Sequence, residues 1–170
     1  SDTTNAGRVY RTGERVDIYR IGTSQTEFAV GAVRVGEWLE YTVDVPAASD
    51  YLLNVRLSAN DTGGAFSVSF NGADKTGLLA VPNTRSTATF RNLRATVRLA
   101  AGRQVVRFDM RKSGRSGLLG HFDHFLLAPV PTNTAPVNPP VAGEPATTVR
   151  PVDVVVSDGG WTNTQGWLAF

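Results

Sequence analysis

Residues 36–46 read Gly-Glu-Trp-Leu-Glu-Tyr-Thr-Val-Asp-Val-Pro, from Gly36 to Pro46, and this stretch decides the fold class. From Trp38 onward the residues alternate between two sides. One side is apolar and holds Leu39, Tyr41, Val43 and Val45; the other holds Trp38, Glu40, Thr42 and Asp44. A period of two predicts a half-buried β-strand, and Pro46 ends it because proline has no N–H to donate to the ladder.

Trp38 is the only large aromatic residue on the polar side of this strand. Its indole offers an apolar face that stacks on the C–H groups of a pyranose, while the neighbouring carboxylate and hydroxyl hydrogen-bond sugar hydroxyls. The alternative is that a loop or the chain's own tail covers the indole.

The same alternation recurs along the chain. Strands are predicted at about 16–19, 28–35, 51–58, 66–70, 76–80, 93–99, 106–110 and 122–127. Asn71-Gly72 is a hairpin signal, because both central positions of a type I′ turn need positive φ. No helical period is present, so the sequence predicts an all-β antiparallel sandwich of the jelly-roll type. Its predicted core is Leu39, Tyr41, Val43, Leu53, Val55, Phe66, Val68, Phe70, Leu93, Val97, Val106, Phe108, Phe122 and Phe125.

Composition narrows the function classes. The chain has no cysteine, no apolar run near the roughly 20 residues of a membrane span, and a net charge of +2, which gives no reason to expect nucleic acid. Its bases are 15 arginines and 2 lysines. Arg56, Arg94, Arg98 and Arg107 point outward from several predicted strands, and an arginine face would suit an acidic polysaccharide, although a solvated surface is the default.

The composition changes after Pro129. We expect a sandwich domain over residues 1–129, a proline-rich connector over 130–148 and a strand-like tail over 149–170. The tail carries Val152, Val154 and Val156 at alternate positions, followed by Trp161 and Trp167.

Several pieces of the sequence resemble, in order, carbohydrate-binding modules of families 6 and 35. These modules are β-jelly-roll appendages of secreted polysaccharide-degrading enzymes. The matching pieces are residues 10–18, 30–31, 36–46, 81–84, 99–102, 106–108 and 122–125. The resemblance implies a non-catalytic polysaccharide-binding module of a secreted or cell-surface protein.

The resemblance also implies where sugar binds. The family's usual cleft lies in loops at one end of the sandwich, but its two aromatic positions fall on Ala32 and about Thr87, and its asparagine falls on about His121. A second site of some members lies on a sheet face and uses the tryptophan that matches Trp38. We therefore expect a site centred on Trp38, with Glu40 and Asn71 as polar partners and His121 as the remaining cleft position.

The resemblance leads us to expect that the chain begins after the family's opening strand, which often supplies ligands to a structural calcium. Asp123 matches the late acidic position, and Asp17 or Glu14 is the remaining candidate ligand. Calcium prefers six to eight oxygens, more than this segment offers. A sandwich without that strand has an open edge that accepts another strand. Residues 149–157 could insert into the chain's own sandwich and complete a monomer, or into a neighbouring subunit, with Trp161 and Trp167 as anchors. A long stiff connector is a poor hairpin, which favours the neighbouring subunit. The alternative function is therefore an assembly module that builds an oligomer or filament by strand donation.

Catalysis and transition-metal binding are not indicated. A glycosidase needs a carboxylate pair, but Glu37 and Glu40 point to opposite faces of the predicted strand. His121 and His124, three residues apart, are likewise expected on opposite faces, which argues against a shared metal.

Overall fold

The computed structural model describes residues 16–24 and 26–131. The predictions for Glu14 and for the tail residues Val152, Val154, Val156, Trp161 and Trp167 lie outside this range. The described part contains no helix. Its strands are β1 Ile18–Arg20, β2 Phe28–Val30, β3 Trp38–Val45, β4 Ser49–Ser58, β5 Ala65–Phe70, β6 Ala73–Asp74, β7 Leu79–Ala80, β8 Arg91–Leu99, β9 Gly102–Lys112 and β10 His121–Pro129.

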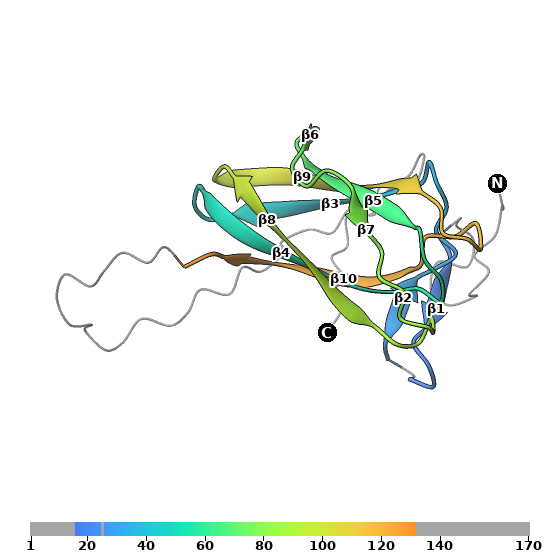
Figure 1. Cartoon of the computed structure of the whole chain (residues 1–170). Coiled ribbons are helices and arrows are strands. Elements are labelled where there is room, and N and C mark those ends of the chain that lie inside the picture. The colour runs from blue at the N-terminus through green and yellow to red at the C-terminus, as the bar shows by residue number, and fades with distance from the viewer. Residues whose placement is uncertain (1–15, 25, 132–170) are drawn as a thin grey trace.

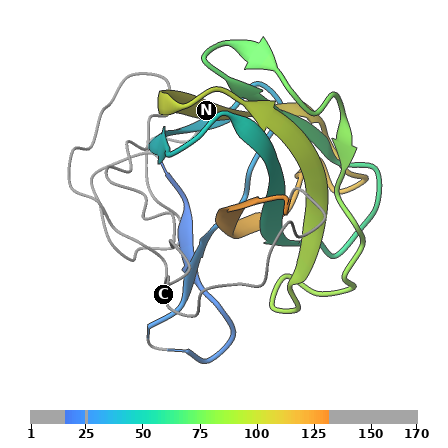
Figure 2. The ribbon, with the colours of Figure 1, turned by 90° about the vertical axis from the view of Figure 1, so that its left-hand side faces the viewer.

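The strands form two antiparallel sheets. One sheet has the order β1-β2-β10-β4-β8 and the other β3-β9-β5-β6, with β7 also paired to β5 (Figure 1). In the end-on view the sheets curve around a shared interior (Figure 2). The predicted antiparallel sandwich of the jelly-roll type is confirmed.

The core lies between the sheets and contains the predicted residues. Eleven of the fourteen are buried, and Phe66, Val68, Val106 and Leu53 have no exposed surface. The other three, Tyr41, Leu93 and Phe125, are partly exposed but pack against the core. Tyr41 and Phe125 lie next to each other, with ring centroids 5.2 Å apart.

Two local features differ from the sequence expectation. The strand predicted at 28–35 stops at Val30, because Ala32 adopts a left-handed backbone with φ of 53° and turns the chain. The strand predicted at 76–80 contracts to Leu79–Ala80. The Asn71-Gly72 hairpin turn is confirmed, since both residues have positive φ, 48° and 80°.

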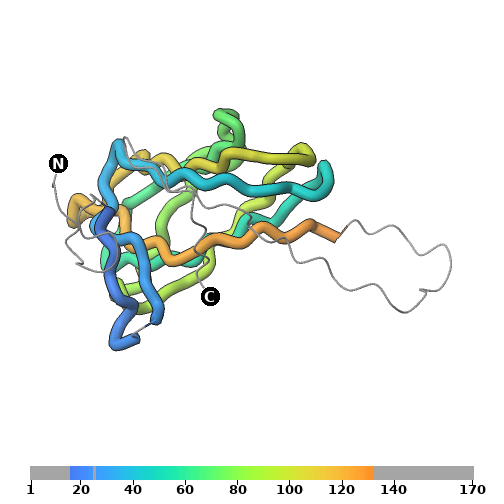
Figure 3. The backbone as a smooth tube through the Cα atoms, turned by 180° about the vertical axis from the view of Figure 1, so that it is seen from behind, coloured from blue at the N-terminus to red at the C-terminus, as the bar shows by residue number. Residues whose placement is uncertain are grey.

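One side of the sandwich is open at its strand edges. Within the described residues β3 pairs only with β9, and β10 pairs with β2 only at Phe122. From His124 to Pro129, β10 has β4 on one side and no described strand on the other. The tube view shows β10 running from the end that carries β1 and β2 to the opposite end of the molecule (Figure 3).

Candidate functional site

Trp38 begins β3 and lies on the outer face of its sheet, as its alternation with buried Leu39 requires. Its direct partner across the ladder is Asp109 of β9, and the next outward residue of β3, Glu40, pairs with Arg107. The side chains of these four residues are partly exposed. The register therefore gathers one aromatic ring, two carboxylates and one guanidinium on a single surface, which we call the Trp38 face.

Arg107 organises the Trp38 face. Its guanidinium carbon lies 4.2 Å from the centroid of the Trp38 ring, a cation–π contact. Its Nε donates to Oδ1 of Asp109 at 2.9 Å, and one terminal nitrogen lies 3.7 Å from Oε2 of Glu40. The two carboxylates hold the guanidinium in place against the indole, so the ring is oriented and one of its faces is occupied.

Two serines of β5 lie next to the Trp38 face but are buried. Ser67 pairs with Asp109 and Ser69 with Arg107, and Arg111 donates from Nε to Oγ of Ser67 at 3.1 Å. The sequence pattern did not indicate that these residues lie beside Trp38. That proximity depends on the β3–β9–β5 order, which alternation alone does not specify.

Asn71, a predicted sugar partner, lies at the far end of β5. It is four residues beyond Ser67, which corresponds to about 13 Å along a strand. Its Nδ2 donates to Oε1 of Gln104 at 2.8 Å, and its Oδ1 accepts from the backbone N–H of Val105 at 2.8 Å. These bonds tie the hairpin turn to β9, so the Asn71 side chain has a structural role.

At the loop end of the sandwich, His121 stacks on Tyr19 with ring centroids 5.4 Å apart and an interplanar angle of 19°. Both rings lie over Gly31, where an added Cβ would fall 2.6 Å from a Tyr19 ring carbon. Burial lowers the pKa of His121. Thr87 is exposed, and its carbonyl accepts a hydrogen bond from Ser58 Oγ at 2.8 Å. This end therefore holds an aromatic pair that the sequence reading missed, because Tyr19 is far from His121 along the chain.

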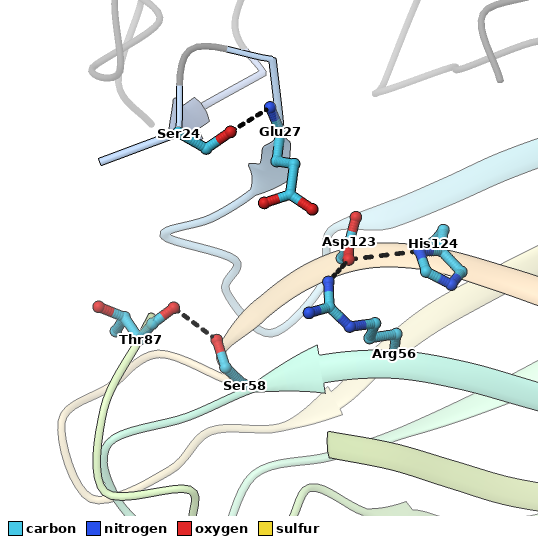
Figure 4. A network of polar contacts seen from close by, with 7 residues as sticks. All are labelled: Ser24, Glu27, Arg56, Ser58, Thr87, Asp123 and His124. Atoms are coloured by element: carbon cyan, nitrogen blue, oxygen red, sulfur yellow. Dashed lines mark hydrogen bonds and ion pairs between the residues drawn. The ribbon is translucent and has the colours of Figure 1, made fainter. Parts of the chain in front are cut away.

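Asp123, a predicted calcium ligand, forms an ion pair with Arg56 instead (Figure 4). His124 Nδ1 lies 3.3 Å from the same oxygen, and the Arg56 guanidinium also lies over the ring of Phe90 at 4.8 Å. Burial alone would raise the pKa of Asp123, but the hydrogen bonds and charges of His124 and Arg56 outweigh it and hold the pKa below its usual value. The other candidate, Asp17, accepts a backbone hydrogen bond from Gly31 through its carbonyl.

Calcium stays a prediction. Among residues 16–24 and 26–131, no group of three or more His, Cys, Asp or Glu side chains is arranged to hold a metal ion. A cation at Asp123 would compete with the charge of Arg56.

The expectation that His121 and His124 lie on opposite faces is wrong. A β-bulge between Phe122 and His124 sets His121 opposite Ser58 and His124 opposite Arg56, so both histidines lie on the same sheet face.

The four arginines do not form the single arginine face that the sequence allowed as the alternative to a solvated surface. Arg56, Arg94 and Arg98 lie on the outer face of β4 and β8, whereas Arg107 lies on the other sheet.

The chain and its fold can be compared with known proteins. A family profile described as "Carbohydrate binding module (family 6)" matches residues 8–127. The chain belongs to carbohydrate-binding module family 6. Modules of this family are non-catalytic binding domains and typically occur in secreted carbohydrate-active proteins. A search of curated proteins found no match.

Solved structures share the fold of the module. A family 6 module from Cellvibrio mixtus lichenase 5A, in complex with cellotriose, has a TM-score of 0.58 at 21% identity, covering 68% of this chain and 87% of that chain. A family 6 module from Clostridium cellulolyticum, in complex with xylose, has a TM-score of 0.56 at 19% identity, covering 66% and 86%. A family 43 arabinoxylan arabinofuranohydrolase from Bacillus subtilis, in complex with cellotetraose, has a TM-score of 0.56 at 21% identity, covering 69% and 25%.

The module's described residues include no helix that is long and apolar enough to cross a membrane.

Proposed function

We propose that the module binds a neutral polysaccharide on the Trp38 face. The observation that carries the proposal is the oriented indole of Trp38 on an otherwise polar sheet surface. Arg107 occupies one face of the ring, which leaves the opposite face for a pyranose. Glu40 and Asp109 have acceptor oxygens near the ring for sugar hydroxyls.

The charges of the Trp38 face favour a neutral ligand. The single positive charge of Arg107 lies between two carboxylates, at 2.9 Å from Asp109 and 3.7 Å from Glu40. A uronate or sulfate brought to this ring would meet those carboxylates first, and like charges at short range are unfavourable. Cellotriose and xylose, the ligands in two related complexes, are uncharged.

The proposal is tested by affinity electrophoresis in gels that contain β-glucan, xylan or polygalacturonate. We expect wild-type protein to be retained by a neutral polysaccharide and Trp38→Ala to lose that retention, because a stacked ring contributes about 0.5–1.5 kcal/mol beyond area burial. Trp161→Ala, which removes the same side chain from the tail, is the matched control. Thermal melting checks that both variants are folded.

A second variant separates the two candidate surfaces. If retention survives Trp38→Ala but is lost in His121→Ala, sugar binds at the loop end and the Trp38 face is not the site. Retention of wild type by polygalacturonate alone would contradict the neutral-ligand part of the proposal.

We further propose that the module is part of a secreted or cell-surface protein, because modules of this family typically occur in secreted carbohydrate-active proteins. Strand donation to a neighbouring subunit, the alternative expected from the sequence, stays a prediction. The observation that favours it is that, among the residues the structure describes, no strand pairs with the edges of β3 and β10 on this side of the sandwich.

A further inference from the structure

The free edge of β10 presents backbone groups that can accept a strand. The N–H of Val130 donates to the carbonyl of Asp50 at 2.8 Å, which makes these two residues a hydrogen-bonded pair. Such pairs alternate along an antiparallel ladder, so Leu127 and Phe125 fall between them, opposite Leu53 and Val55. Their N–H and C=O groups therefore point away from β4, toward the side where no described strand lies.

Apolar side chains line the interior beside this edge. The rings of Tyr41, Phe108 and Phe125 are in mutual contact, with Phe125 5.2 Å from Tyr41 and 5.1 Å from Phe108. A small pocket opens here between β3 and β10, and these rings and Leu39 contribute to its wall. Tyr41, Phe125 and Leu127 are the partly exposed members of the core at this side. A strand that adds to β10 would cover them.

We propose that residues 149–157 of the same chain pair antiparallel with the free edge of β10. This stretch alternates, with Val152, Val154 and Val156 on one side and Asp153 and Val155 on the other. The alternation matches an edge that needs apolar side chains inward, against Tyr41, Phe125 and Leu127, and tolerates other residues outward.

The connection favours pairing within one chain. The connector leaves from β10 itself, so a returning strand runs antiparallel to β10 without crossing the sheet. Residues 130–148 span roughly 60 Å when extended at about 3.1 Å per residue, about twice the length of β10. The connector is long enough to reach the edge, so pairing within one chain does not depend on the protein concentration, whereas pairing with a neighbouring subunit does.

Hydrogen exchange of the whole chain tests the proposal. The reporters are the amides of Phe125 and Leu127, which only an added strand would protect. We expect slow exchange in the wild type and exchange at least ten times faster in Val154→Asp, which places a charge against the aromatic side chains. Val155→Asp is the matched control, because the same charge on the outward side should leave both amides protected.

Several outcomes would overturn the proposal. Equal exchange in the two aspartate variants would show that residues 149–157 have no inward side. Unchanged protection after deletion of residues 146–170 would assign the edge to another segment. Size-exclusion chromatography at two concentrations completes the test: a monomer throughout supports pairing within the chain, and a concentration-dependent oligomer with protection lost on dilution would assign the strand to a neighbouring subunit.

Discussion

At the scale of single residues, charged side chains of this module act mainly as organisers. Arg107 fixes the indole of Trp38 through its contact with the ring and its two carboxylate partners. Arg56 plays a comparable part on the other sheet, where it joins Asp123 to Phe90. In both places a guanidinium lies against an aromatic ring and an acid, an arrangement that the planar fork of arginine allows and lysine does not.

The Asp123 ion pair predicts a loss of stability in acid. Because the pKa of Asp123 is lowered in the folded protein, its contribution is complete above the unfolded value, 3.8, and is lost as the pH falls through the folded value. Asp123→Asn should lower the free energy of unfolding at pH 7 by about 1.5–3 kcal/mol, the range for hydrogen bonds to charged groups. Urea titrations at pH 7 and pH 3 measure both effects.

Asp50→Asn is the control for this prediction. Asp50 pairs with Arg98 at 3.5 Å, but both side chains are more than half exposed, so the expected change is below about 1 kcal/mol. Equal losses in the two variants would show that the Asp123 pair is no stronger than a surface pair.

At the scale of elements, the long strands follow from the sequence and the short segments do not. Alternation identified β3, β4 and β8, because each buries mainly one face of its own sequence. It also identified β5, although all six residues of that strand are buried. The predicted continuation of the strand beyond Val30 was wrong. A positive φ at Ala32 ends the strand, and the hydropathy pattern of the sequence does not reveal it. The bulge in β10 was not predicted, for a related reason. It reverses the direction of the side chains that follow it through one extra residue, Asp123, which has no partner in the β4 register. The hydropathy pattern does not mark this residue.

The candidate site was likewise predicted only in part. The alternation along β3 predicted that Trp38 and Glu40 lie together on an outer face. Arg107 and Asp109 join them only through the pairing of β3 with β9, a contact between residues about 70 positions apart, which local propensity does not encode.

β5 supplies the central phenylalanine of the sandwich. Phe66 is fully buried and contacts Phe122 edge-on, with ring centroids 5.2 Å apart, and Phe108 at 6.1 Å. Phe66→Ala should lower the free energy of unfolding by about 3–5 kcal/mol, measured by urea titration. Leu78→Ala, at a side chain that is 68% exposed, should change it by less than about 0.5 kcal/mol. A small effect at Phe66 would contradict its place between the sheets.

At the scale of the whole molecule, β3 serves two surfaces. Its outward side carries Trp38 and Glu40, and its inward side carries Tyr41 at the open edge. The proposed glycan surface therefore lies on the outward side of β3, whereas its inward side contributes Tyr41 to the interior beside the proposed strand-binding edge of β10.

The titration of Tyr41 measures how well the interior between β3 and β10 is shielded from water. Burial raises the pKa of Tyr41 to about 12 from the usual 10.0. The neutral phenol is thus favoured in the folded state, so its stabilising effect is complete below pH 10 and is lost as the pH rises through 12. We expect the wild type to lose stability between pH 9 and 11, and Tyr41→Phe to lose less, in urea titrations at the two pH values. Parallel losses in both proteins would show that Tyr41 titrates as an exposed phenol.

If Trp38 binds an insoluble glycan as proposed, the position of the two ends of β10 has a mechanical consequence. The start of β10 lies beside the segment before β3, where Leu119 donates to the carbonyl of Val33 at 2.8 Å, and Trp38 follows that segment. The connector leaves from Pro129 at the far end (Figure 3). Tension between a glycan on Trp38 and the connector therefore runs along the strands. It loads the β10–β4 hydrogen bonds together, in shear, rather than peeling them apart one after another, and so resists detachment by flow.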